Sequence, residues 1–255
     1  MDRLPVQEER LMHRFYADPD RSDAAVFVLN PEDARHAGKV LRLQPGTEVE
    51  VFFGGERYLA VLDRLSSDSA ELRPLRLLPS TEPSLSVTLF QGLPKSDKMD
   101  WIVQKSVELG VCRIVPVAFS RCVVRLEEKE AARKQERWQR IAREAGKQSG
   151  RCLIPEVCSP VSFSALPALF SGCEQVAVPW EECPQGGPLA FSKRHPSPAS
   201  LGIVIGPEGG ISPDEMRALE SFGGEPVTLG KRILRTETAG LAALSVFFGI
   251  YGEME

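Results

Sequence analysis

Two short segments in the C-terminal third suit a ligand-binding site, the first through its glycines and the second through a glycine and three cations. The first covers residues 205–211 (IGPEGGI), and the second covers residues 229–239 (LGKRILRTETA). Glycines allow the backbone to approach a ligand closely, because they carry no side chain. In the second segment, Lys231, Arg232 and Arg235 precede a predicted helix start, where cations oppose the helix dipole. This unfavourable placement indicates an anionic or electron-rich ligand, with cations that simply project into water as the alternative.

The sequence lacks several other motifs of binding or catalysis. Neither segment reads GxGxxG, and no GKS or GKT follows, so a dinucleotide loop or a phosphate loop is not supported. GxSxG is absent, and His13, His36 and His195 lack the spacing of a metal site or a catalytic triad. The six cysteines form no CxxC pair, so we expect reduced thiols and no metal site. A tight strand-to-helix turn remains the alternative explanation for the glycines.

The neighbouring residues place both segments at the ends of strands. Residues 201–205 (LGIVI) are apolar throughout, which is typical of a central strand in a parallel sheet. Residues 212–215 (SPDE) predict a helix that opens with a capping box. Residues 227–229 predict the last strand of the chain. Both segments therefore lie between a predicted strand and a predicted helix, and ligands bind beyond the carboxyl ends of parallel strands.

Strands and helices alternate through the rest of the C-terminal part. Further strands are predicted at residues 85–90, 111–117 and 176–178, and helices at residues 97–109 and 127–147. The second helix should bury the stripe formed by Trp138, Ile141, Ala142 and Ala145. This order of elements predicts an α/β domain with a mostly parallel sheet.

The last predicted helix, residues 237–251, is apolar on nearly every side. Thr236 or Thr238 could cap its first turn. A helix of this kind at the end of a chain suits a subunit interface, and a central helix of one monomer explains the pattern nearly as well.

The N-terminal part has a different pattern of predicted elements, with short strands around tight turns. Asn30 and Pro31 predict a helix start after a short strand at 26–29. Further strands are predicted at residues 47–51, 58–62 and 70–77, with Gly54 and Gly55 turning the chain between the first two. Short strands around tight turns predict a small barrel. Residues 78–84 resemble a linker, so we expect two domains, residues 1–78 and 79–255.

The charges are distributed unevenly although the net charge is only −4. Residues 129–151 contain eight Lys or Arg and three Glu, whereas residues 201–255 contain four basic and eight acidic residues. A basic middle and an acidic end suit a chain that contacts a polyanion with one face. A solvated helix face is the ordinary alternative for such a basic run. No apolar leader and no apolar run of membrane-spanning length is present, so we expect a cytoplasmic protein.

Taken together, the motifs resemble the RsmE family of the SPOUT superfamily, along essentially the whole chain. Residues 205–210 and 229–239 carry most of the resemblance. Supporting matches are His36 to Arg42 (HAGKVLR), Lys95, residues 104–110 (QKSVELG) and the long helix from Trp138 to Arg151. One departure is Lys231, where family members often have proline.

The resemblance implies a PUA-like β-barrel followed by an α/β methyltransferase domain with a deep trefoil knot. It implies a homodimer that binds S-adenosylmethionine in the knot. It also implies methylation of N3 of the uridine at position 1498 of 16S ribosomal RNA, within the small ribosomal subunit. Two other interpretations stay open. One is a SPOUT enzyme that acts on a different RNA nucleotide or on a ribose 2′-OH, and the other is a non-catalytic RNA-binding assembly factor.

The reaction requires stabilisation of the uridine anion formed when N3 loses its proton. Arg235 is our candidate catalytic residue, because its forked donors suit a delocalised anion. Glu208 and Glu237 are candidates for the proton acceptor, with water as the alternative.

The remaining predicted site residues fall into two groups. We expect the cofactor to contact Val178, Pro179, Ile205, Gly206, Gly210, Leu229, Gly230, Ile233, Leu234, Thr238 and Ala239. We expect RNA to contact Arg14, Arg35, His36, Arg42, Lys95, Lys105, Arg121, Gln148 and Arg151.

Overall fold

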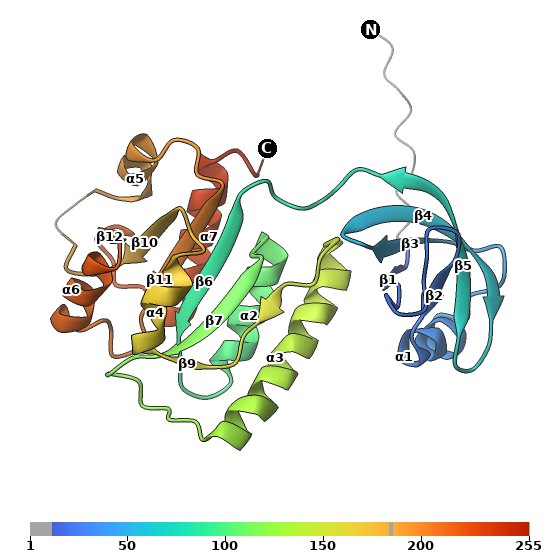
Figure 1. Ribbon diagram of the computed structural model, residues 1–255, viewed down its shortest axis with the longest axis horizontal. Coiled ribbons are helices and arrows are strands. Elements are labelled where there is room, and N and C mark those ends of the chain that lie inside the picture. The colour runs from blue at the N-terminus through green and yellow to red at the C-terminus, as the bar shows by residue number, and fades with distance from the viewer. Residues whose placement is uncertain (1–11, 184–185, 255) are drawn as a thin grey trace, which may run out of the picture. The chain divides into compact units, whose positions relative to one another are not determined.

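The chain folds as two compact units in a computed structural model, which describes residues 12–183 and 186–254 (Figure 1). The first unit extends to Glu82 and includes the short segment Gly150–Leu153. The second unit comprises Pro83–Ser149 and the chain from Ile154 onward. The units thus divide four residues after the predicted boundary at 78, and the first unit also takes in a segment from the middle of the chain.

The first unit is a small curled sheet. Its strands are β1 (Arg14–Tyr16), β2 (Phe27–Leu29), β3 (Glu48–Phe53), β4 (Glu56–Leu65) and β5 (Ala70–Leu78), in the order β1-β3-β4-β5-β2. A bridge between Ala17 and Leu29 joins the two edges, so the sheet closes on itself as predicted. The β3–β4 hairpin turns at Gly54 and Gly55, both with positive φ. β1 had no counterpart among the predicted strands.

A short helical segment covers this sheet. Asn30 caps α1 (Pro31–Arg35) by accepting a hydrogen bond from the Asp33 amide at 2.9 Å, which confirms the predicted helix start. A π-helical turn, His36–Val40, continues α1. Ala34 and Ala37 of this segment are buried against the apolar inner face of the sheet.

The second unit is built on a seven-stranded sheet, and all of its recorded strand pairs are parallel. Its order is β12-β10-β11-β6-β7-β8, with β9 also pairing with β7. The strands are β6 (Ser86–Gly92), β7 (Arg113–Ala118), β8 (Glu156–Val157), β9 (Val161–Ser162), β10 (Gln175–Pro179), β11 (Ser200–Ile205) and β12 (Gly224–Val227). The helices are α2 (Lys98–Leu109), α3 (Glu128–Ser149), α4 (Leu166–Phe170), α5 (Pro188–Arg194), α6 (Pro213–Ser221) and α7 (Thr236–Ile250).

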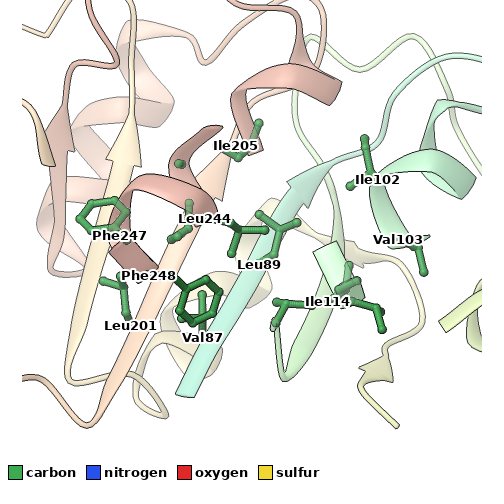
Figure 2. Close-up of a cluster of buried hydrophobic side chains, with 14 of the residues drawn as sticks. Val87, Leu89, Ile102, Val103, Ile114, Leu201, Ile205, Leu244, Phe247 and Phe248 are labelled. Carbon is green, nitrogen blue, oxygen red and sulfur yellow. The ribbon is translucent and has the colours of Figure 1, made fainter. Parts of the chain in front are cut away.

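Both faces of this sheet are buried, which explains the continuous apolar character of its central strands. On one face, side chains such as Leu89 and Ile114 pack against Ile102 of α2 and Leu244 of α7 (Figure 2). The adjacent residue of β6, Phe90, points to the opposite face and packs in a cluster with residues of α4 and α6. These two cores fix the strand ends at which residues 205–211 and 229–239 begin.

Most predicted elements of this unit are confirmed within a few residues. Gly110 ends α2 with a φ of 111°, and the Ser212–Glu215 capping box opens α6. The long helix buries Trp138, Ala142 and Ala145, with Ile141 only partly buried. Among the described residues, no helix is both long and apolar enough to cross a membrane.

The last strand was predicted too far along the chain. β12 ends at Val227, so Thr228 and Leu229 lie outside it. The Thr228 hydroxyl accepts a hydrogen bond from the Gly230 amide at 3.1 Å, and this local turn replaces strand pairing. Its partner β10 ends at Pro179, which is in register with Val227. Both residues beyond β12 therefore belong to the following loop.

Candidate functional site

Two adjoining hollows lie where β10, β11 and β12 end. The first, about 440 Å³, is formed by residues 205–211 and the start of α7, and we call it the loop-206 hollow. The second, about 360 Å³, is formed mainly by residues 228–234, and we call it the loop-229 hollow. Both are lined by Pro179, Glu181, Ile233, Leu234 and Ala239. The shared lining makes the hollows two parts of one site in the second unit.

Glycines shape the loop-206 hollow. The Gly210 amide donates to the Pro207 carbonyl at 2.9 Å, and Gly210 has a φ of +71° that a side chain would strain. A Cβ on Gly206 would lie 2.8 Å from Cγ1 of Ile211, so the close turn after β11 requires glycine there. The turn therefore exposes backbone to the hollow.

The loop-229 hollow has a glycine at its turn and apolar walls. Gly230 has a φ of +102°, and no atom lies within 4 Å of the place where its Cβ would be. The Ile233 side chain is 88% exposed, although it borders both hollows. A large exposed apolar side chain beside open backbone is suited to contact with a flat apolar ligand group.

A hydrogen-bonded chain joins the two segments behind the hollows. Gln91 Nε2 donates to Thr236 Oγ1 at 2.8 Å, and this hydroxyl donates to the Gly206 carbonyl at 2.7 Å. Gln91 is completely buried and Thr236 is 5% exposed. Thr236 thus fixes the start of α7 to the loop after β11. The predicted capping role of Thr236 or Thr238 is wrong, because Arg235 is the N-cap residue and no side chain caps the helix.

A lysine bridges two acidic side chains beside the loop-206 hollow. Lys98 Nζ lies 3.0 Å from Glu208 Oε1 and 3.1 Å from Glu237 Oε2. The Lys95 amide also donates to both Glu208 carboxylate oxygens, at 3.0 and 3.3 Å.

These contacts shift the pKa of all three groups toward their charged forms. The hydrogen bond to Glu208 raises the pKa of Lys98 most, and the hydrogen bond to Glu237 is the second cause. Burial by itself would raise the pKa of Glu208, but hydrogen bonds from Lys95 and Lys98 outweigh it and lower this pKa. The pKa of Glu237 is lowered in the same way, by a backbone hydrogen bond and Lys98 acting against burial.

Arg235 is placed where a ligand can reach it. It is the N-cap of α7, its side chain is exposed, and it lines the loop-206 hollow. Among the described residues, no carboxylate forms an ion pair with its guanidinium. Its donors are therefore available to an electron-rich group that enters the hollow.

The other predicted cofactor residues gather here with two exceptions. Those that line one or both hollows are Pro179, Ile205, Gly206, Gly210, Leu229, Gly230, Ile233, Leu234 and Ala239. Val178 is instead fully buried in β10 and packs in the core. Thr238 is exposed on α7 and lines neither hollow.

The sequence interpretation missed several residues of the site. Trp180 and Glu181 directly follow β10, so the rule that ligands bind at strand ends could have identified them. Lys98 gave no local signal, because its partner Glu208 is 110 residues away in the chain.

Four predicted RNA-binding residues belong to the second unit. Lys95 is exposed beside the loop-206 hollow, and Arg121 Nη1 donates to the Gly209 carbonyl at 3.1 Å. Lys105 pairs with Glu108 at 2.7 Å and lies 5.1 Å from the ring centre of Trp101. Gln148, which is exposed, lines a groove of about 570 Å³ between α2 and α3.

The other five lie in the first unit, in varied surroundings. Arg35 and His36 are exposed on the helical segment, and Arg42 has a left-handed backbone with φ 54°. Arg14 pairs with Glu50 at 3.1 Å.

Arg151 differs from the rest, because it is only 4% exposed and its Nη2 lies 2.6 Å from Glu82. This buried pair anchors the segment Gly150–Leu153, and a guanidinium held by Glu82 in this way is poorly placed for the predicted RNA contact.

Among the described residues, no three His, Cys, Asp or Glu side chains come together in a group that could hold a metal ion. The site is therefore assembled from backbone, apolar side chains and the charged groups named above.

Comparison with known proteins connects this geometry to a family. Residues 81–248 match the family described as RNA methyltransferase domain, and residues 29–75 match that described as RNA methyltransferase PUA domain. A relative from Bacillus subtilis (strain 168), named ribosomal RNA small subunit methyltransferase E, is 35% identical over 92% of this chain and 95% of its own. A relative of the same name from Synechocystis is 34% identical over 95% of this chain and 80% of its own.

A solved structure gives the same result. The ribosomal RNA small subunit methyltransferase E of Neisseria gonorrhoeae, bound to S-adenosylmethionine, is 36% identical to this chain. The match covers 94% of this chain and 98% of that one, with a TM-score of 0.81. The protein is thus a member of the RsmE family, the ribosomal RNA small subunit methyltransferases E.

Proposed function

We propose that the protein transfers a methyl group from S-adenosylmethionine to N3 of a uridine in 16S ribosomal RNA, at the position that its family resemblance implies. The observation that carries this proposal is the pair of joined hollows with Arg235 exposed at the rim of one of them. The related enzyme of Neisseria gonorrhoeae binds the same cofactor.

The residues present suit this cofactor. Gly206, Gly210 and Gly230 leave backbone uncovered where a side chain would close the hollows or strain the loops. Ile233 and Leu234 offer apolar surface to an adenine ring. When bound, S-adenosylmethionine supplies a methyl group on a sulfonium. In the transfer a carbon–sulfur bond breaks, a bond from carbon to N3 forms, and the N3 proton leaves.

Arg235 stabilises the reacting base in this proposal. Removal of the N3 proton spreads negative charge onto the two uridine carbonyl oxygens. The forked donors of an arginine can bind such a delocalised anion, which lowers the free energy of the transition state. An Arg235 that is not bound to a carboxylate is free to take this role.

The surroundings of Glu208 and Glu237 disfavour both as the proton acceptor. Each carboxylate is within 3.1 Å of Lys98, and each has a lowered pKa, so its affinity for a proton is weak. Because Lys98 engages both carboxylates, we infer that Lys98 and the two acids hold the loops in place. The N3 proton then passes to bulk solvent as the uridine ionises, and Arg235 stabilises the anion that remains.

A homodimer is part of the same proposal. α7 exposes Val246 (43%) and the preceding loop exposes Ile233 (88%), and we propose that such apolar surface is covered in a homodimer. The trefoil knot, the small ribosomal subunit as substrate and a cytoplasmic location follow from the family resemblance.

Labelling of RNA tests the function directly. The purified protein is incubated with S-adenosylmethionine carrying a radioactive methyl group and with small ribosomal subunits from cells that lack the modification. Digestion of the RNA should yield label in 3-methyluridine. Label in a different nucleoside would keep the methyltransferase and reject the target. Absence of both label and cofactor binding would favour the non-catalytic RNA-binding protein instead.

A further inference from the structure

One acidic side chain at the centre of the site has no role in the proposed reaction. Glu181 follows β10 and lines both the loop-206 and the loop-229 hollow. Among the described residues, no hydrogen bond or ion pair joins its carboxylate. The other two acids near the site, Glu208 and Glu237, are both held by Lys98. Glu181 therefore presents the carboxylate that is free to bind a ligand where the hollows meet.

Loop 205–211 leaves space for this carboxylate. A Cβ built on Gly210 would lie 2.7 Å from Glu181 Oε1, closer than a real Cβ approaches any atom. Gly210 thus combines a positive φ with a close contact to the acid. Because Oε1 is the far end of a flexible side chain, this contact places the carboxylate beside the loop, while the positive φ is what favours glycine at position 210.

The order of groups along the site matches the order of groups along the cofactor. The loop-229 hollow, with Leu229 and Trp180, is suited to an apolar ring. The loop-206 hollow, with Arg235 at its rim, is the reaction end in the proposed function. In an adenosyl sulfonium, a ribose with two neighbouring hydroxyls lies between the adenine and the reacting methyl group. A carboxylate at the junction of the hollows faces this part of the molecule.

We propose that Glu181 binds the ribose of the cofactor by accepting hydrogen bonds from its 2′- and 3′-hydroxyls. Carboxylates bind ribose hydroxyls in other nucleotide sites at strand ends, and hydrogen bonds from O–H to O⁻ are among the stronger ones in proteins. This assignment rests on the proposed use of S-adenosylmethionine. It makes Glu181 a residue that selects a ribonucleoside, separate from the chemistry at Arg235.

Calorimetric titration with S-adenosylhomocysteine and with its 2′-deoxyribose analogue tests the assignment. The proteins are the wild type, Glu181→Gln and the control Glu182→Gln, whose adjacent exposed carboxylate lines neither hollow. We expect Glu181→Gln to weaken binding of S-adenosylhomocysteine by about 10- to 100-fold, the effect of a hydrogen bond to a charged group. The deoxy analogue should bind the wild type about 10-fold more weakly than S-adenosylhomocysteine, and this difference should shrink to about 3-fold or less in Glu181→Gln.

The possible results distinguish a failure of the ribose assignment from a failure of the proposed function. Wild-type affinity in Glu181→Gln would overturn the ribose assignment and leave the function intact. A full penalty for the deoxy analogue in Glu181→Gln would also overturn it, because another group would then bind the 2′-hydroxyl. Failure of the wild type to bind S-adenosylhomocysteine would overturn the function together with the assignment. Because Glu181 is exposed, all three proteins should have the same circular dichroism spectrum and melting temperature.

Discussion

At the scale of single residues, we expect Arg235 to contribute to the chemical step and not to the binding of the cofactor. It lines the loop-206 hollow at the start of α7, and its guanidinium is exposed. Arg235→Ala should lower kcat by about 10²- to 10³-fold, the usual effect of removing one donor that stabilises a developing anion. The dissociation constant of S-adenosylhomocysteine should change by less than about threefold.

Single-turnover methylation and calorimetry measure these two quantities separately. Arg217→Ala is the matched control, because Arg217 is an exposed arginine on α6 that pairs with Asp214 outside the hollows. Turnover of Arg235→Ala at the wild-type rate would remove Arg235 from the mechanism.

A strained residue stands beside the site. Ser96 has a φ of 57°, in the left-handed region that favours glycine, directly after the amide of Lys95 that binds Glu208. Ser96→Gly should raise the melting temperature of the second unit, with a gain of up to about 1 kcal/mol in the free energy of unfolding. Thermal unfolding followed by circular dichroism measures it. A lower melting temperature would show that the serine side chain contributes more than the backbone strain costs.

At the scale of elements, the chain from Gln91 through Thr236 to Gly206 joins β6, α7 and the loop after β11. Thr236→Val removes the hydroxyl that both accepts and donates, leaving the Gly206 carbonyl without this donor. The expected loss is about 1 to 3 kcal/mol of stability, because a buried polar group loses its partner. Binding of S-adenosylhomocysteine should weaken as the loop loses its support.

Thr238→Val is the matched control for this change. Thr238 is two residues further along α7 and is exposed, so the substitution should alter neither the melting temperature nor the binding affinity appreciably. Equal effects of the two substitutions would contradict a specific role of the Thr236 hydroxyl.

The stability of a second element, the start of α6, is expected to depend on pH. Glu215 is 8% exposed and accepts hydrogen bonds from the amides of Ser120 at 2.7 Å and Ser212 at 3.0 Å. Burial by itself would raise the pKa of Glu215, but these hydrogen bonds outweigh it, so its pKa in the folded protein lies below the ordinary value of 4.5. The carboxylate therefore contributes stability above this value, and the contribution is lost as the pH falls through the folded pKa.

Comparison of the wild type with Glu215→Gln tests this direction of the pH dependence of stability. Near neutral pH the variant should be less stable by about 1 to 3 kcal/mol, and the difference should shrink below about pH 4. Urea denaturation at several pH values measures both curves. A stability difference that stays constant with pH would mean that the effect arises from the shape of the Glu215 side chain and not from the charge of its carboxylate.

The same elements show what the sequence could predict. Periodicity, Gly110 and the Ser212–Glu215 capping box placed α2, α3 and α6 correctly, because helix ends are determined by neighbouring residues. The end of β12 was placed wrongly, because the turn at Thr228 forms through a side-chain hydrogen bond that composition does not reveal. The short strands β8 and β9 have too few residues for a pattern, and their pairing with β7 determines them.

The candidate site was predictable to the extent that its residues follow strands directly. Both loops were predicted as candidate binding segments, because glycines after one strand and cations after the other are local signals. The ion pairs of Lys98 and the hydrogen bond between Gln91 and Thr236 join residues more than 100 positions apart. Only the fold brings such residues together, so no local pattern could identify them.

At the scale of the whole molecule, the two units have separate apolar cores. The first unit closes a small sheet around Phe15, Phe27 and Val49, and the second covers both faces of its parallel sheet. The hollows with Arg235 and Glu181 lie entirely in the second unit. Binding of the cofactor should therefore raise the melting temperature of the second unit by mass action.

Recognition of RNA is expected to involve charge spread along the chain more than any single contact. The net charge is −4, yet α3 exposes a row of arginines that includes Arg133 and Arg140. Each arginine that neutralises a phosphate releases bound counterions, so RNA affinity should fall steeply as salt rises. The double substitution of Arg133 and Arg140 by alanine should weaken binding across unrelated RNA sequences. It should also reduce the slope of log affinity against log salt by about 1 to 2.

Filter binding over a range of salt concentrations measures this slope. The control is the double substitution Arg64→Ala and Arg73→Ala, which removes two exposed arginines that pair with carboxylates on the first unit. The control should leave the slope unchanged, because these cations are already neutralised. An unchanged slope in the α3 variant would mean that the basic run of α3 is a solvated helix face. RNA recognition would then have to depend on other cations, such as Lys95 beside the loop-206 hollow.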